Sequence, residues 1–118
     1  MSTWIKRGKQ TARSDLPGCH GGNGTLDWAE VVSEGELPGR RLSSFHDDVL
    51  PPGASIGVHQ HEDDEEYYYI LSGTGIMTLD GVDHTVEPGD LTAVFPGGSH
   101  GLRNTGAANL RVLVVSIR

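Results

Sequence analysis

The sequence contains almost no cysteine. Cys19 is the single cysteine among 118 residues, which excludes an internal disulfide framework and leaves a packed core as the source of stability. No apolar segment near the N-terminus resembles the hydrophobic part of a secretory signal, and no apolar run is long enough to cross a bilayer. We therefore expect a soluble protein of a reducing, cytoplasmic compartment. The sequence shows no group that clearly activates Cys19, so we expect an unreactive thiol.

Positive charge is also scarce. The chain has 9 Lys and Arg against 16 Asp and Glu, which gives a net charge of −7 with histidine neutral. This balance argues against nucleic acid or an anionic membrane surface as the main partner, because both attract clustered positive charge. A small molecule is the partner that we expect.

Long helical periodicity is absent as well. In its place are 17 Gly and 6 Pro between short apolar segments, a pattern typical of many short strands joined by turns. Asp80–Gly81 suits a two-residue hairpin turn with positive φ angles. The last apolar segment is continuously aliphatic, which indicates a strand buried on both faces. The expected strands are 41–49, 76–79, 82–86, 91–95 and 110–117, with strand or edge structure from Thr25.

The stretch 53–73 holds the strongest chemical signal. If the segment around His59 and His61 is a strand, side chains alternate between its faces, so the two imidazoles point the same way. The aromatic segment from Glu66 fits a following strand, and the acidic residues between the two fit the turn that joins them. Glu66 would then lie near the start of an antiparallel partner strand and could add an oxygen to a metal that the histidines hold.

Two spacings in the chain resemble the two motifs of the cupin family. The first, G-x5-H-x-H-x4-E-x6-G, is filled by Gly53, His59, His61, Glu66 and Gly73. The second is filled by Gly89, Gly97, His100 and Asn104. The family has a proline where this chain has Phe95, and here the proline is Pro96, which we interpret as a local change in the turn. The chain is thus similar to small single-domain cupins, and the resemblance implies an all-β jelly-roll barrel.

The resemblance also implies a mononuclear metal site. Its ligands would be His59, His61, Glu66 and His100. Three neutral imidazoles and one carboxylate suit a divalent transition metal, and Fe(II), Mn(II), Ni(II) and Zn(II) are all compatible with them. Glu65 is a rival for Glu66, which is preferred because it also fits the spacing to Gly73.

Three further histidines are left outside the metal set. His46 is expected to be a surface or cross-strand residue, with contact to a substrate as the alternative. His84 is expected on the solvent side of its hairpin. His20 belongs to an N-terminal arm at 1–23, which we expect to lie across the barrel or a dimer partner; in the alternative, Cys19 and His20 reach the mouth of the pocket. A single cupin domain is expected over 1–118. Its barrel core is expected at 39–118.

Strand alternation predicts the lining of the site. The side chains expected to point inward are Glu66, Tyr68, Ile70, His100, Leu102 and Asn104. Those expected on an outer face are Tyr67, Tyr69 and Leu71. The cavity should therefore be mainly apolar with one phenol beside the metal. Tyr68 is the candidate catalytic acid or base, with a core aromatic as the alternative. The outer apolar residues, or the N-terminal arm, predict a homodimer contact.

The function that the resemblance implies is a metal-dependent enzyme. The superfamily includes isomerases, lyases, cyclases, decarboxylases and dioxygenases, so membership does not name the reaction. We expect Lewis-acid isomerase, lyase or cyclase chemistry on a small keto, enol or hydroxy acid or ring. An iron-dependent dioxygenase and a non-catalytic small-ligand-binding cupin are the alternatives.

Overall fold

The computed structural model describes residues 2–118, and this part of the chain is almost entirely β-structure. Its elements are η1 (Gly8–Gln10), β1 (Arg13–Pro17), η2 (Cys19–Gly21), β2 (Thr25–Val32), β3 (Leu42–Leu50), β4 (Ser55–Gln60), β5 (Glu65–Ser72), β6 (Gly75–Leu79), β7 (Val82–Val86), β8 (Leu91–Val94), β9 (Ser99–Arg103) and β10 (Leu110–Ile117). The two η elements are single 3-10 turns. The all-β class expected from the sequence is confirmed.

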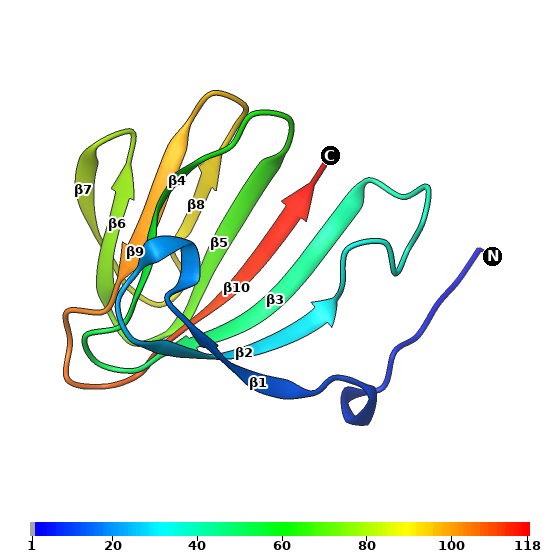
Figure 1. The fold of residues 1–118 in the computed structure, drawn as a ribbon, viewed down its shortest axis with the longest axis horizontal. Coiled ribbons are helices and arrows are strands. Elements are labelled where there is room, and N and C mark those ends of the chain that lie inside the picture. The colour runs from blue at the N-terminus through cyan, green and yellow to red at the C-terminus, as the bar shows by residue number, and fades with distance from the viewer. Residues whose placement is uncertain (1) are drawn as a thin grey trace.

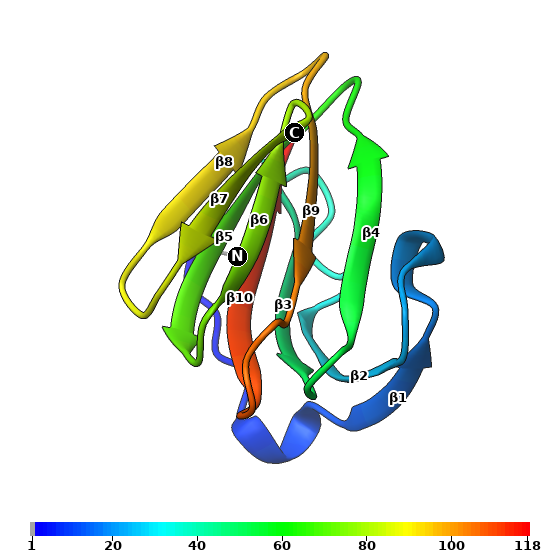
Figure 2. The same cartoon turned by 90° about the vertical axis from the view of Figure 1, so that its left-hand side faces the viewer.

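The strands form two sheets that pack face to face (Figures 1 and 2). The larger sheet has the order β1-β2-β3-β10-β5-β8, and the smaller one has the order β4-β9-β6-β7. Neighbours in these orders are antiparallel and mostly far apart in sequence, as in a jelly roll. The apolar core lies between the sheets, and its largest fully buried members include Leu26, Leu50, Ile70, Met77 and Leu102.

The predicted pairing of the two segments on either side of the acidic turn was wrong. Strand β4 pairs with β9 in the small sheet, whereas β5 pairs with β10 and β8 in the large sheet. Both edges of β5 are therefore occupied. His61 lies just past β4 and exchanges backbone hydrogen bonds with Gly97 and Gly98, which ties it to the turn before β9. The acidic residues thus carry the chain from one sheet to the other, and Glu66 faces the histidines across the interior.

Strand β10 lies in the middle of the large sheet, between β3 and β5. The prediction that both of its faces are buried was wrong. Its inward face, from Leu110 to Ser116 at every second position, is buried, but Arg111 is exposed and the other outward residues are half-buried. The reason is that the small sheet covers only one face of the large one (Figure 2).

The β6–β7 hairpin follows the sequence expectation. Its turn residues Asp80 and Gly81 have φ angles of 47° and 79°, as a two-residue turn between twisted strands requires. The hairpin packs beside β9 and so completes the sheet that carries His100.

The loop between β1 and β2 folds against β4. Asn23 accepts a hydrogen bond from the Ser55 amide and donates one to the Ser55 hydroxyl. The backbones come so close that a Cβ atom at Gly57 would collide with the carbonyl oxygen of His20, and one at Gly22 with that of Ser55. Gly22 and Gly57 therefore allow this loop to lie directly on the strand that carries His59. The boundaries predicted for the arm and the core stay a prediction.

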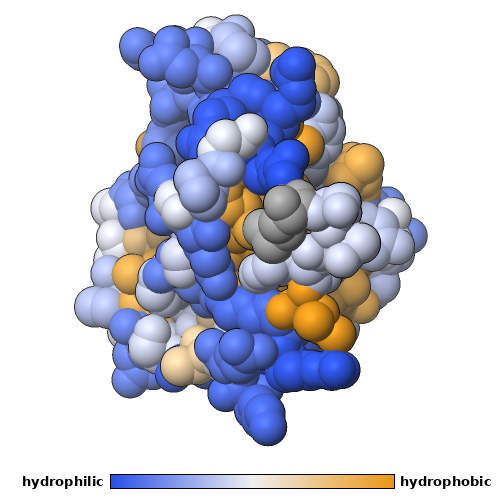
Figure 3. Space-filling model, turned by 90° about the vertical axis from the view of Figure 1, so that its right-hand side faces the viewer, coloured by the Kyte–Doolittle hydropathy of each residue, from blue (hydrophilic) through white to orange (hydrophobic). Residues whose placement is uncertain are grey.

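The side of the molecule that bears the β2–β3 connection and the C-terminus is mainly hydrophilic, with small separate apolar patches (Figure 3). Within residues 2–118, no helix is both long enough and apolar enough to cross a membrane.

Candidate metal centre

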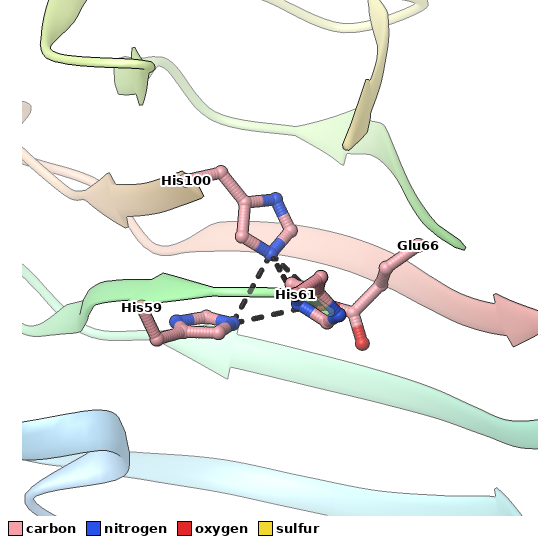
Figure 4. A group of neighbouring side chains, drawn as sticks. All are labelled: His59, His61, Glu66 and His100. Carbon is pink, nitrogen blue, oxygen red and sulfur yellow. Dashed lines mark hydrogen bonds and ion pairs between the residues drawn. The ribbon is translucent and has the colours of Figure 1, made fainter. Parts of the chain in front are cut away.

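Four side chains from different parts of the fold converge between the sheets (Figure 4). They are His59 near the end of β4, His61 in the following turn, Glu66 on β5 and His100 on β9. Their ligand atoms all lie within 4.8 Å of one another. The structure thus brings together the four residues that the sequence nominated.

The spacing of these atoms fits the ligands of one ion. Ligand atoms bonded to a metal at about 2.1 Å and at right angles lie about 3 Å apart. The His100 Nε2 atom is 3.1 Å from the Nε2 atoms of both His59 and His61. The Glu66 Oε1 atom is also close to the three Nε2 atoms. It lies 3.0 Å from Nε2 of His100, 3.4 Å from Nε2 of His61 and 3.9 Å from Nε2 of His59.

The hydrogen bonds behind the histidines leave their lone pairs facing the centre. Nδ1 of His59 lies 2.7 Å from the Gly57 carbonyl oxygen, and Nδ1 of His61 lies 2.8 Å from an Asp64 carboxylate oxygen. Each Nδ1 is therefore assigned the proton, and each Nε2 is an acceptor. Two such acceptors beside a third imidazole and a carboxylate repel one another unless a cation or a proton lies between them. Burial would lower the pKa of His59, but Glu66 outweighs burial and raises it.

His100 supports the same conclusion. Its side chain is fully buried, and its Nδ1 atom has no hydrogen-bond partner in the described chain. Burial lowers the pKa of His100 and outweighs the opposing effect of Glu66, so the ring is neutral. A neutral imidazole with Nε2 toward the centre is the form that binds metals.

The Glu66 carboxylate is held in the ionised form. Burial alone would raise its pKa, but the close His100 and His59 rings and the hydrogen bond from the Ser116 hydroxyl outweigh burial and bring the pKa well below its usual range. The Ser116 hydroxyl donates to Oε2 at 2.5 Å, which leaves Oε1 for the centre. Its rival Glu65 accepts a hydrogen bond from the Tyr67 hydroxyl and lies outside the cluster.

Of the three histidines left outside the metal set, His84 is exposed on β7. His20 lies flat on His59, with ring centroids 3.7 Å apart and planes 12° apart. Its backbone has φ of 49°, an unusual value outside glycine that the loop imposes. Cys19 and His20 both line the cavity described next, so the alternative in which they reach the pocket is the observed arrangement.

A cavity of about 120 Å³ adjoins Glu66 between the sheets. It is lined by Leu16, Cys19, His20, Trp28, His46, Asp48, Ile56, Glu66, Tyr68 and Val114. Most of the lining surface is apolar, as expected, but polar groups of His46 and Asp48 also line it, and these were not expected. Of the residues expected inward, Ile70, Leu102 and Asn104 are buried outside this lining, and the Asn104 amide instead donates to the carbonyls of Leu50 and Ala108.

Sequence reasoning missed one side of the cavity, formed by Trp28, His46 and Asp48, which we name the polar wall. Trp28 pairs with Asp48 across β2 and β3, and its ring meets that of His46 edge-on at 5.3 Å. The place of His46 in this lining is compatible with the alternative in which it contacts a substrate. Alternation along β3 predicts that His46 and Asp48 share one face. The pairing of β2 with β3, which adds Trp28, cannot be predicted from a local sequence pattern.

Burial governs the protonation of the other lining groups. Desolvation, with smaller contributions from Asp47 and Glu66, raises the pKa of Asp48 to about 7. Desolvation, with smaller contributions from Asp48 and Glu66, raises the pKa of Cys19 to about 11. The pKa of Tyr68 is raised well above its usual value, again chiefly by burial. The thiol and the phenol therefore keep their protons at neutral pH.

Comparisons with known proteins agree with this description. A family model described as "Cupin domain" matches residues 47–116. A Thermotoga maritima protein named oxalate-binding protein is 34% identical over 113 residues, which cover 96% of this chain and 93% of the relative.

Solved structures extend the comparison. A crystal structure described as a predicted oxalate decarboxylase from Thermotoga maritima matches with a TM-score of 0.88 at 32% identity, over 97% of this chain and 98% of the other. KdgF from Halomonas matches with a TM-score of 0.75 at 18% identity, over 99% of this chain and 96% of the other, which shows a shared fold. The chain belongs to the cupin family.

Proposed function

We propose that the protein is a metal-dependent lyase that removes carbon dioxide from a small oxygenated acid of the oxalate class. The observation that carries the proposal is the convergence of three imidazoles and a carboxylate beside a small cavity between the sheets. The Thermotoga maritima matches, whose names refer to oxalate, support the ligand class.

The residues that would hold the ion are His59, His61, Glu66 and His100. A divalent ion there would act as a Lewis acid on a carboxylate or keto oxygen. The side chains bring one negative charge, from Glu66, to the centre, so an ion of charge +2 leaves a net positive site that attracts an anionic acid. The buried walls exclude water, which strengthens that attraction.

Tyr68 is the residue that we propose as the proton donor. Its side chain is 2% exposed, lines the cavity and lies beside His100, with ring centroids 4.5 Å apart. Its high pKa keeps the hydroxyl protonated, which suits an acid better than a base. In the lyase reaction the carbon–carbon bond of the oxalate dianion breaks, carbon dioxide leaves, and the remaining carbon takes one proton to give formate. The phenol supplies that proton and is reprotonated from solvent.

A second candidate is reversible binding of the same acid without turnover. The name of the 34% identical relative, oxalate-binding protein, favours it. The metal centre would serve both functions, because the ion attracts the acid whether or not a bond then breaks.

One experiment tests the proposal and separates these candidates. Protein loaded with the ion that elemental analysis finds after purification is incubated with oxalate, while formate, carbon dioxide and dissolved oxygen are followed. We expect formate and carbon dioxide in equal amounts with no oxygen consumed, and none from chelator-treated protein. Calorimetric binding without products would establish the second candidate, and oxygen uptake would assign the protein to the dioxygenase class. Absence of both binding and products with every ion would overturn the proposal.

A further inference from the structure

Two enclosed atoms of the polar wall have no hydrogen-bond partner in the described chain. They are Oδ1 of Asp48 and Nε1 of Trp28. Asp48 as a whole is 3% exposed. Buried polar groups are nearly always paired, because an unpaired one loses its bonds to water without replacement. The pair therefore points to a partner that is not part of the chain.

The fold sets these two groups side by side. Trp28 on β2 and Asp48 on β3 are directly opposite in the register of the antiparallel pair, so their side chains leave the sheet on the same face. Both line the cavity that also contains Glu66, one of the four proposed ligands. A molecule held by an ion at the metal centre would therefore extend toward the polar wall.

The chemistry of the pair suits the outer oxygen atoms of an anion. The indole nitrogen can only donate. The Asp48 carboxyl holds its proton up to about pH 7, because burial raises its pKa, and it can then donate as well. Within residues 2–118, no lysine or arginine lines the cavity. Hydrogen-bond donors, in place of a fixed positive charge, are what this wall offers.

We propose that Trp28 and Asp48 recognise the outer oxygen atoms of a small dicarboxylate bound at the metal centre, and so select dicarboxylates over 2-oxo monocarboxylates. This rests on the proposed function. Oxalate can give one oxygen of each carboxylate to the ion and present the other two to the wall. Pyruvate can give the same two oxygens to the ion, but it presents a methyl group where oxalate has its second outer oxygen. The two acids are thus matched probes of the wall.

The test is a calorimetric titration of oxalate and of pyruvate into metal-loaded protein. The variants are Asp48→Leu and Trp28→Phe, which remove a donor, and Asp48→Asn, which keeps one in its amide. Thr92→Val is the matched control, since the Thr92 hydroxyl is also enclosed without a partner but does not line the cavity. Metal content and melting temperature are measured for every variant.

We expect Asp48→Leu and Trp28→Phe each to weaken oxalate binding by about tenfold or more while pyruvate changes by about twofold or less. Asp48→Asn should keep most of the preference for oxalate, and Thr92→Val should keep all of it. Equal losses of affinity for oxalate and pyruvate, or an unchanged preference for oxalate in Trp28→Phe and Asp48→Leu, would overturn this inference. The proposed function would still stand. If metal-loaded wild-type protein binds neither acid, the proposed function falls and the inference falls with it.

Discussion

The metal centre and the polar wall belong to one cavity but differ in how their polar atoms are satisfied. At the centre, hydrogen bonds from behind orient three of the four candidate ligands, as Asp64 does for His61 and Ser116 does for Glu66, while Nδ1 of His100 has no such partner within residues 2–118. In the wall, the Trp28 indole nitrogen and one Asp48 oxygen have no such support. Groups that are oriented before a ligand arrives bind it with little reorganisation. We infer that one end of the cavity is oriented in advance and suits an ion, and that the other end would be completed by a ligand.

Removal of a proposed metal ligand should have the largest effect, which is a loss of bound metal. Replacement of His100 or His61 by alanine should abolish most metal binding, because the ion loses a ligand and the other lone pairs face a buried gap. Elemental analysis of protein purified without added chelator measures this. The matched control is His84→Ala, an exposed histidine of β7, which should retain the metal content of the wild type. Full metal content in His100→Ala would disprove the ligand assignment.

Removal of the Tyr68 hydroxyl should lower turnover without disturbing either end of the cavity. Tyr68→Phe keeps the buried ring against His100 and removes only the donor, so we expect turnover to fall by roughly two to four orders of magnitude. Metal content and melting temperature should barely change. Unaltered turnover would return Tyr68 to a packing role and leave a metal-bound water as the proton donor.

Loss of the ring that supports His59 should weaken the metal centre by a smaller amount. His20 stacks on His59 and positions its ring, so His20→Ala should reduce metal affinity by about 10–100-fold. His20→Phe retains a flat ring and should restore most of that affinity. Competition with a chromophoric chelator gives the affinities. Equal affinity in wild type and His20→Ala would show that the stack has no positioning role.

Asp48 of the polar wall should make the free energy of unfolding depend on pH. The pKa of Asp48 is about 7 in the folded protein and near 3.8 in the unfolded chain. Between these two pH values the folded protein binds more protons than the unfolded chain does. The free energy of unfolding that Asp48 contributes is therefore complete below about pH 4 and is lost as the pH rises toward 7. Asp48→Asn cannot ionise and should therefore become more stable than the wild type, by about 1–3 kcal/mol at neutral pH.

Chelator-treated protein is the right sample for that measurement, because bound metal would add its own pH dependence. The neighbouring charges on Asp47, Glu66 and Arg13 are common to wild type and variant, so they largely cancel in the difference. Urea unfolding at several pH values gives the free energies. A difference that stays constant from pH 4 to 8 would contradict the raised pKa.

Substitutions on the outer face of β5 should have the smallest effect on the site. Tyr69 and Leu71 are about 40% exposed there, close to the exposed Leu91 of β8, and we expect this face to form a homodimer contact. Light scattering should give a dimer mass at micromolar concentration, and a Tyr69→Lys, Leu71→Lys variant should give a monomer with unchanged metal content. A monomer mass for the wild type would refute the contact.

What could be predicted from the sequence followed from local spacing. Alternation along one strand put His59 beside His61, and the interval to Glu66 matched a family motif, so the sequence named all four residues that the structure brings together as candidate ligands. The same alternation separated Tyr68 from the exposed Tyr69. These relations depend on neighbours along the chain and need no knowledge of the sheets.

What could not be predicted depends on which strands pair. A pattern of alternating residues fits a strand but does not name its partner, and for this reason β4 and β5 were wrongly paired. The polar wall was missed because Trp28 and Asp48 meet only through the register of β2 and β3, twenty positions apart. Raised pKa values follow burial, which the residue types alone do not reveal.

The most direct test of the account is anomalous diffraction from crystals of the metal-loaded protein soaked in oxalate, recorded at the absorption edge of the bound ion. The account predicts one peak within bonding distance of Nε2 of the three histidines and Oε1 of Glu66. It also predicts oxalate on that ion, with outer oxygens within hydrogen-bond distance of Asp48 and Trp28. A peak at any other place, or no peak from protein shown to contain metal, would contradict it.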